Sequence, residues 1–185
     1  MARIPPLKPE ELSEHQHKLA TEIGSIRGGR LAVIGPWGLL LRNPELCERG
    51  AAFGTLLRDG TSVPKRLSEL AIAITARYWT AQFEWNAHAP LAVRAGVSQD
   101  VIDAIRARRR PRFALRDEEA VYDYLTELYE QKRVHENTYR ALVAEIGPQA
   151  AIELTAIAGF YSAIAMLIVA FEVDLPQGAV PQLPE

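Results

Sequence analysis

The stretch that decides the fold runs from Arg66 to Gly96 and reads RLSELAIAITARYWTAQFEWNAHAPLAVRAG. It reads as helical, and it places Glu84 and His88 four positions apart. Residues i and i+4 share one face of a helix, so this carboxylate and this imidazole can reach each other. Such a pair can handle protons, because the carboxylate stabilises the imidazolium and orients the ring. The alternative is a surface ion pair worth roughly a few tenths of a kcal/mol.

Two further charged side chains of this stretch, Glu69 and Arg77, fall with Glu84 and His88 within roughly a 100° arc at helical periodicity. In one straight helix, however, Glu69 and His88 would be about 28 Å apart along the axis, at 1.5 Å per residue. They can share a site only if the chain turns between them. Thr80 makes that turn plausible, because a threonine can cap the start of a second helix.

The overall composition indicates one ordinary globular domain spanning residues 1–185. With 48% hydrophobic and 24% charged residues and a net charge of −2, neither disorder nor a nucleic-acid partner is expected. The ends, about 1–8 and 175–185, are expected to be extended or loose. The single cysteine, Cys47, rules out an intramolecular disulfide and any CxxC motif, which is compatible with a cytoplasmic location. We see no signal peptide.

Helix start and stop signals recur along the chain. Asn43 and Pro44 supply a cap and a first-turn proline, Ser98 caps another segment, and Gly147 followed by Pro148 separates two more. No segment shows the period-2 alternation that is typical of a strand. The sequence therefore predicts an all-α, single-domain bundle of about seven to nine helices.

One segment raises the question of a membrane. Residues 154–171, LTAIAGFYSAIAMLIVAF, contain no charge and meet the minimum length of a spanning helix. Glu153 and Glu172 flank the segment, and neither end has the Lys or Arg cluster that sets orientation. A helix that is apolar all round also suits the centre of an all-α domain or a subunit interface. We therefore expect no membrane and a homo-oligomer.

Other chemistries have weaker signals. Cys47 lies early in a helix, but no histidine is near it in sequence, and a lone cysteine is usually a small core residue. Glu84 and His88 lack an obvious third ligand, so no metal is expected. The arginines of residues 106–112 are interpreted as a solvated helix end, with a phosphate role as the alternative. The glycine-rich segment 32–42 with Trp37 could line a pocket or be a buried connection.

The segment from Arg66 to Ile105 resembles the core of the carboxymuconolactone decarboxylase family, which has the alkyl hydroperoxidase D-like fold. The similar pattern is R-x-x-E-L, an alanine-rich helix, E-W-x-x-H, a helix ending in A-G, and a capped S-x-x-x-I helix. The flanks GPWGLLLRNPEL and ELTAIAGFYSAIAMLIVAFEVDLP resemble a longer-chain subgroup of the same family. The resemblance thus spans most of the chain and implies that fold.

The resemblance also carries chemical implications. The peroxidase branch of the family has C-x-x-C-x-x-x-H with a Glu upstream, and its two cysteines fall here at Ala81 and Glu84, while His88 and Glu69 match its histidine and glutamate. Without thiols at these positions, disulfide-based peroxide reduction cannot run. The decarboxylase branch uses a thiol-free, histidine-bearing and cofactor-free site. It removes CO₂ from an unsaturated lactone acid and then protonates the resulting dienolate.

On this resemblance the chain is expected to be a cofactor-independent lyase acting on a small cyclic carboxylic acid. His88 would be the general acid, Glu84 would orient it and favour its protonated form, and Glu69 would act as a relay. The expected substrate-binding residues are Arg77, which suits a carboxylate, together with Trp85, Asn86 and Trp37. Two alternatives stay open: a peroxidase-like stress protein without CxxC chemistry, and a non-catalytic helical oligomer.

Overall fold

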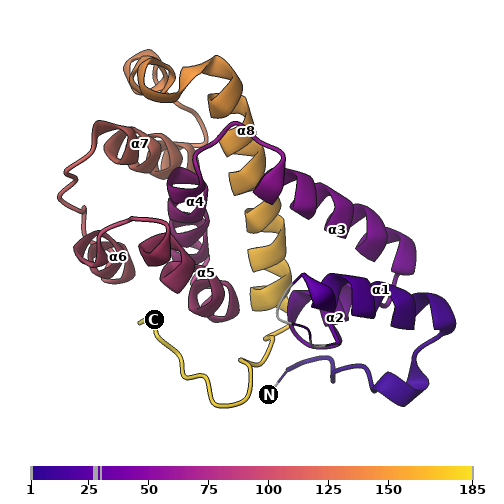
Figure 1. Ribbon diagram of the computed structural model, residues 1–185. Coiled ribbons are helices and arrows are strands. Elements are labelled where there is room, and N and C mark those ends of the chain that lie inside the picture. The colour runs from indigo at the N-terminus through magenta and orange to yellow at the C-terminus, as the bar shows by residue number, and fades with distance from the viewer. Residues whose placement is uncertain (1, 27–28, 30, 185) are drawn as a thin grey trace.

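The computed structural model describes residues 2–26, 29 and 31–184, and within these ranges the chain forms eight α-helices and no strand (Figure 1). This confirms the all-α prediction. A short 3₁₀ turn at Pro9–Glu11 precedes the first α-helix. The helices are α1 (Glu14–Ser25), α2 (Gly35–Leu40), α3 (Pro44–Asp59), α4 (Lys65–Tyr78), α5 (Gln82–Arg94), α6 (Gln99–Arg106), α7 (Arg116–Gln131) and α8 (Glu136–Ala170).

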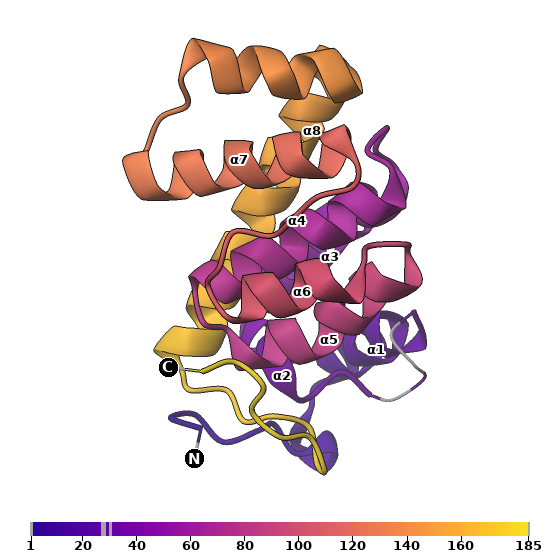
Figure 2. The ribbon, with the colours of Figure 1, turned by 90° about the vertical axis from the view of Figure 1, so that its left-hand side faces the viewer.

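Helix α4 lies at the centre of the molecule. Every residue from Leu67 to Arg77 is buried, and α4 packs against α5, α7 and α8, as the two views in Figures 1 and 2 show. The middle of α4 alternates Ala and Ile and is apolar on every side, which suits a helix surrounded by neighbours. The polar side chains that α4 does bury need partners, because an unpaired buried polar group costs free energy. Besides Arg77, they are Ser68, Glu69 and Thr75.

The predicted turn between two helices is confirmed, but the predicted cap is wrong. Thr80 has a φ of +52°, and the residue at the N-cap of α5 is Ala81, without a side-chain cap. The Thr80 hydroxyl is instead an acceptor for Arg77 Nη1 at 3.0 Å and Arg108 Nη2 at 3.1 Å. The arginines therefore occupy the oxygen that was expected to cap α5.

Several of the other helix boundaries follow local sequence signals. The Asn43 side chain accepts a hydrogen bond from the Leu46 amide, and the Ser98 hydroxyl accepts one from the Asp100 amide, as their capping role predicts. Helix α8 is interrupted at Gly147, which has φ +79° and ψ 164° and therefore breaks the helical path before Pro148. The apolar part of α8 is thus a separate helical segment, as predicted.

This apolar part of α8 crosses the whole molecule beside α4 (Figure 1). It is long and apolar enough to cross a membrane by length and composition alone, and 39% of its most apolar 18-residue window is buried inside the protein. Its buried side packs on α4, α7 and α2, while Ile152 and Met166 are 72% and 51% exposed. The helix therefore serves as a core element on one side and presents apolar residues on the other.

The C-terminal segment lacks helix among its described residues, and hydrogen bonds attach it to the body of the protein. Gln82 Nε2 donates to the Leu183 carbonyl at 2.7 Å, and Gln82 Oε1 accepts from the Leu183 amide at 3.0 Å. Leu183 itself is buried. Figure 2 shows the segment running back along the molecule beside α5. The tail therefore contributes to the surface around the central helices.

The chain before α2 passes very close to Gly38, a residue inside that helix. A Cβ at Gly38 would lie 2.1 Å from the Val33 carbonyl oxygen, a backbone atom that cannot move aside alone. We expect Gly38→Ala to lower the free energy of unfolding by about 1–3 kcal/mol, since forced overpacking costs that much. Gly50→Ala is the matched control, because its Cβ would meet only Leu40 Cδ1, at 4.0 Å. In helix α3 that change is expected to be neutral or slightly stabilising. Urea unfolding of both variants measures the difference.

Candidate active site

The structure brings Glu69, Glu84 and His88 together. His88 Nδ1 lies 2.8 Å from Glu69 Oε2, and His88 Nε2 lies 3.3 Å from Glu84 Oε1. The three residues are 4% exposed or less. One imidazole therefore lies between two buried carboxylates, and each ring nitrogen faces one of them.

This arrangement follows from the hairpin of α4 and α5. Glu69 and His88 both lie about two to three helical turns from the connection, so the two arms of the hairpin bring them side by side. Glu84 is on the same helix as His88, one turn earlier, where the i, i+4 spacing places it on the same face. The predicted Glu84–His88 contact is thus local, whereas the contact with Glu69 requires the turn at Thr80.

Lys65 connects the cluster to the surface. Its Nζ lies 3.1 Å from Glu69 Oε1, and its side chain is 48% exposed. The contact is an ion pair without the alignment of a hydrogen bond, since Oε1 has no aligned donor. A continuous series of ionisable groups therefore runs from solvent at Lys65 through Glu69 and His88 to Glu84.

The charge state of Glu69 follows from its surroundings. Burial alone raises the pKa of this carboxyl, but the hydrogen bond and charge of His88 and the charge of Lys65 outweigh burial, so its pKa lies below the ordinary value. Glu69 is therefore ionised near neutral pH, and Nδ1 of His88 carries the proton that it accepts. His88 Nε2 faces Glu84, so the cluster combines one imidazole with two carboxylates, groups that are used in general acid–base catalysis.

Sequence reasoning missed two residues of the cluster. Lys65 precedes Glu69 by four residues, a spacing that could have identified the ion pair. Tyr161, from the apolar part of α8, contacts His88 edge to face, with ring centroids 5.1 Å apart and an interplanar angle of 76°. A tyrosine within a long apolar run is a usable signal, because its hydroxyl needs a partner when buried.

The structure places Arg77 away from His88. Its guanidinium donates to the Arg106 carbonyl, the Thr80 hydroxyl and the Pro184 carbonyl at 2.9, 3.0 and 3.1 Å. Eight residues of helix separate it from Glu69, which is about 12 Å along α4. Arg77 therefore holds the end of α6 and the C-terminal tail, and nothing in its contacts connects it with the imidazole.

The other three predicted substrate-binding residues are also dispersed. Asn86 donates to the Gln82 carbonyl at 2.9 Å and accepts from Gln182 Nε2 at 3.0 Å, so it binds the tail. Trp85 is buried in the main core, and Trp37 is buried in the second hydrophobic cluster beside α1 and α3. A substrate-binding role for these side chains stays a prediction.

The cluster is enclosed. None of the five main cavities in the described part of the chain is lined by Glu69, Glu84 or His88. Nor does any group of three or more His, Cys, Asp or Glu in those ranges have the arrangement to hold a metal ion. Cys47 lies in the second hydrophobic cluster, where burial raises the pKa of its thiol to about 11. At neutral pH this thiol is protonated and a poor nucleophile.

Comparison with known proteins identifies the fold. No protein-family model matches the chain, and no curated protein is significantly similar to it. Among solved structures, an uncharacterized peroxidase-related protein with an alkylhydroperoxidase AhpD core from Ralstonia eutropha JMP134 is similar, with a TM-score of 0.76 and 15% identity over 97% of each chain.

Two further solved structures are similar to this chain over most of its length. A variant of the debrominase Bmp8 in complex with 2,3,4-tribromopyrrole has a TM-score of 0.73 and 15% identity, over 93% of this chain and 90% of that one. An uncharacterized peroxidase-related protein from Silicibacter sp. TM1040 has a TM-score of 0.71 and 14% identity, over 95% and 89% of the two chains. At such low identity these likenesses establish architecture and not activity. The chain has the all-helical AhpD-like fold.

Proposed function

We propose that this protein is a cofactor-independent acid–base enzyme of the carboxymuconolactone decarboxylase type, acting on a small cyclic carboxylic acid. The observation that carries the proposal is the buried imidazole between two carboxylates, with Nδ1 at 2.8 Å from Glu69 and Nε2 at 3.3 Å from Glu84. Such an arrangement fixes the ring and holds one mobile proton, which is what protonation of a carbanionic intermediate requires.

The proposed reaction needs one proton and no electron acceptor. The bond between the ring carbon and the carboxylate breaks, CO₂ leaves, and the electron pair stays on the substrate as a dienolate. The proton held between His88 Nε2 and Glu84 then moves to the substrate carbon. Glu69, kept ionised in part by Lys65, holds the ring oriented through Nδ1, and a proton from solvent returns to the Nε2–Glu84 side after the product has left.

Two alternatives have specific observations in their favour. The enclosure of the cluster, with none of the described cavities reaching it, favours a structural role in a non-catalytic helical protein. The likeness to structures described as peroxidase-related favours a peroxidase-like function. The latter would have to be independent of thiols, since the only cysteine is Cys47, which is buried and protonated.

One set of assays separates the three functions. Purified full-length protein is mixed with carboxymuconolactone and related lactone acids while CO₂ release is measured, and with hydrogen peroxide and an alkyl hydroperoxide while peroxide loss is measured. The decarboxylase proposal expects CO₂ release that Cys47→Ser leaves unchanged. Thiol-independent peroxide loss without CO₂ release would favour the peroxidase-like alternative. Inactivity toward both classes of compound would favour the structural role.

We also propose that the exposed face of α8 pairs with a second copy of the chain. The face repeats at alternating intervals of four and three residues, which is the seam of a helix that packs along another helix. Small residues in the seam allow two backbones to approach closely, and an apolar stripe of this length is poorly suited to water. The seam consists of Ile152, Ala156, Gly159, Ala163, Met166 and Ala170.

A charge within this seam is expected to separate the copies. Met166 is 51% exposed in a single chain, so Met166→Glu should leave the fold intact and place an unpaired carboxylate in the proposed interface. Light scattering after gel filtration is expected to show an oligomer for the wild type and a monomer for the variant. Glu136→Gln, at the exposed start of α8 and outside the seam, is the control. An oligomer that survives Met166→Glu would contradict this interface.

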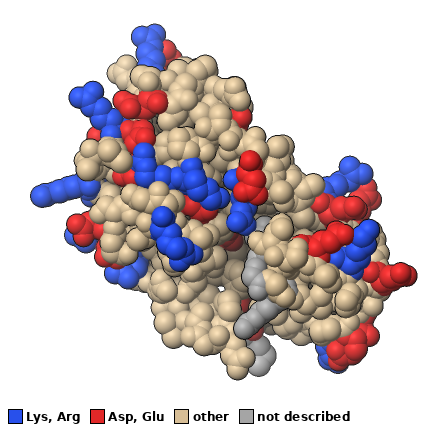
Figure 3. Space-filling view, viewed as in Figure 1, with Lys and Arg blue, Asp and Glu red and all other residues tan. Residues whose placement is uncertain are grey.

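A cytoplasmic location, a small-molecule substrate and the absence of nucleic-acid and membrane partners are part of the same proposal. Basic and acidic side chains are interspersed over the face shown in Figure 3, which suits a small-molecule enzyme better than a nucleic-acid-binding protein. We propose that α8 is a core and interface helix of a cytoplasmic protein and not a membrane span.

A further inference from the structure

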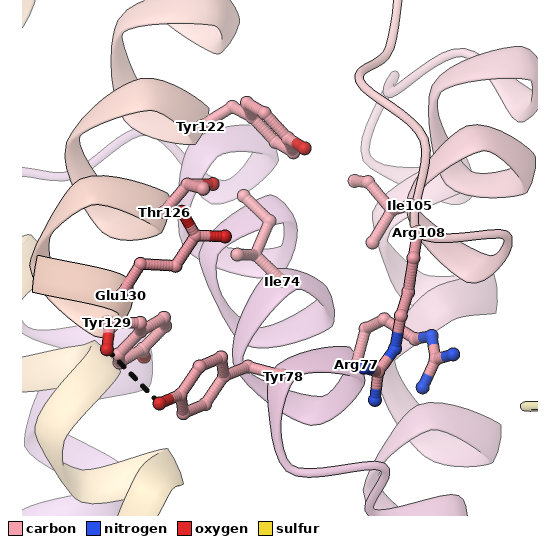
Figure 4. A pocket seen from close by; sticks show the side chains of 9 residues that line it. All are labelled: Ile74, Arg77, Tyr78, Ile105, Arg108, Tyr122, Thr126, Tyr129 and Glu130. Atoms are coloured by element: carbon pink, nitrogen blue, oxygen red, sulfur yellow. Dashed lines mark hydrogen bonds between the residues drawn. The ribbon is translucent and has the colours of Figure 1, made fainter. Parts of the chain in front are cut away.

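We propose that the cavity between α4, α7 and the end of α6 binds a small planar aromatic carboxylate, with Arg77 and Arg108 holding the carboxylate group. This site is separate from the His88 cluster, and the inference does not rest on the proposed function. Figure 4 shows the two guanidinium groups side by side at one end of the cavity, opposite the side chains of α7.

The two arginines form an uncompensated pair of positive charges. Arg77 is only 4% exposed, and it donates to two backbone carbonyls and to the Thr80 hydroxyl, which Arg108 also contacts. Among the residues that the structure describes, no carboxylate lies within ion-pair distance of either guanidinium. A buried charge without an opposite charge is costly, so an anion here would be favourable. A guanidinium also presents two parallel donors that match a carboxylate.

The position of Arg108 has an electrostatic consequence for Arg77. Burial, and then the positive charge of Arg108, lower the pKa of Arg77 below its ordinary value. Arg77 uses three of its five N–H donors on neutral acceptors, so two remain for a ligand. A bound anion would offset the repulsion between the two guanidinium groups.

The rest of the cavity favours a flat ring. Its apolar side is formed by Ile74 of α4 and Ile105 of α6, and its α7 side by the rings of Tyr122 and Tyr129. Tyr129 is held by stacking on Tyr78, with centroids 4.6 Å apart and an angle of 18°. The cavity measures about 250 Å³. Pockets for drug-sized ligands start at about 300 Å³, so this one suits a single ring.

A carboxylate at the mouth of the cavity refines the choice of ligand. Glu130 lines it from α7, is exposed, and has no ion-pair partner among the described residues. Because it lies across the cavity from the arginines (Figure 4), it would repel an anionic group at its own end and accept a hydrogen bond from a donor there. A ring with a carboxylate at one end and a hydroxyl at the other, such as 4-hydroxybenzoate, satisfies both ends.

Titration calorimetry on the full-length protein tests the ligand class. We expect saturable binding of 4-hydroxybenzoate, with the uncharged 4-hydroxybenzamide at least about tenfold weaker, because it cannot make charge-assisted bonds to the arginines. Cyclohexanecarboxylate and inorganic phosphate, which lack the flat ring, are also expected to bind more weakly. Two results would overturn the proposal. One is equal affinity for the acid and the amide. The other is binding that does not saturate at ligand concentrations below about 10 mM, near the weak end of specific binding.

Two matched arginine variants locate the site. Arg108→Gln is expected to weaken 4-hydroxybenzoate binding about tenfold, the loss of one charge-assisted contact. Arg109→Gln removes the same charge one residue along the chain, from a side chain that lines a different cavity, and should change affinity less than about twofold. Equal losses in the two variants would show a diffuse charge effect and overturn the site.

Two further variants test whether the ring of the ligand occupies the cavity and whether the Glu185 side chain competes with the ligand. Thr126→Phe fills the cavity without changing charge and is expected to abolish binding while circular dichroism stays unchanged. Glu185 follows Pro184, whose carbonyl contacts Arg77. Glu185→Gln is therefore titrated as well, and unchanged affinity is expected for an external ligand. A gain of tenfold or more would identify the Glu185 side-chain carboxylate as the anion and overturn the proposal.

Discussion

Replacing His88 by glutamine is expected to lower the rate of CO₂ release by about 10²–10⁴-fold, the usual contribution of a positioned general acid or base. Glutamine is close to the size of histidine and can still contact Glu69 and Glu84, but it cannot deliver the proton that the proposed reaction takes from His88. The loss should therefore fall on kcat more than on KM, because the missing interaction acts in the proton-transfer step. Steady-state kinetics on a lactone acid that the wild type turns over gives both constants.

The control for this variant is a histidine in a similar pair at the surface. His135 contacts Glu127, and its side chain is 48% exposed. His135→Gln is expected to leave the rate within about twofold, because exposed pairs contribute little. Circular dichroism and thermal unfolding of His88→Gln establish that the protein is folded. If the folded variant turns over lactone acids at the wild-type rate, the acid role of His88 is wrong and the cluster is structural.

Replacing Glu69 by glutamine is expected to cost about 2–4 kcal/mol of the free energy of unfolding, since it removes the charged partner of a buried imidazole and of Lys65. The change should also alter the pH dependence of stability. The pKa of Glu69 is lower in the folded protein than its ordinary value of 4.5, so its stabilising contribution is present above that value. The contribution is lost as the pH falls through the lower, folded pKa.

Urea unfolding at a series of pH values measures both effects. The gap between wild type and Glu69→Gln is expected to be constant near neutral pH and to narrow below about pH 4.5. Glu127→Gln is the matched control. The pKa of Glu127 is also lowered, chiefly by its hydrogen bond to His135, but that partner is about half exposed, so solvent screens the pair more than it screens the buried Glu69–His88 pair. A gap for Glu69→Gln that stays unchanged down to pH 3 would show that Glu69 is not the titrating group.

The fold of this protein and the residues beside His88 resemble different groups of proteins. The helices superpose on structures described as peroxidase-related, over nearly the whole chain. The resemblance drawn from the sequence, in contrast, places Ala81 and Glu84 where the peroxidase branch has its cysteines. In the structure, Glu84 instead takes part in the contact with His88 Nε2. The same helical frame therefore holds a histidine between two carboxylates in place of the thiols, which illustrates why fold alone does not assign an activity.

The candidate site could be predicted only in part, and particular residues show why. The pairing of Glu84 with His88 is an i, i+4 contact within one helix, so the spacing was sufficient. Arg77 shares the same helical arc in the sequence, but it contacts Arg106 and Pro184, which are distant along the chain. A one-dimensional periodicity gives the face of a helix and does not say which neighbour covers it.

The sequence by itself determined the all-α class, the helix ends at Asn43, Ser98 and Gly147, and the absence of cysteine at positions 81 and 84. These features depend on local hydrogen bonds, backbone conformation or residue identity. Only the tertiary structure decided that Glu69 completes the cluster, that Lys65 connects it to solvent, and that Arg77 faces a second cavity. Each of these depends on how the chain turns at Thr80 and on which helices pack against α4, because contacts between distant residues arise from packing and not from local spacing.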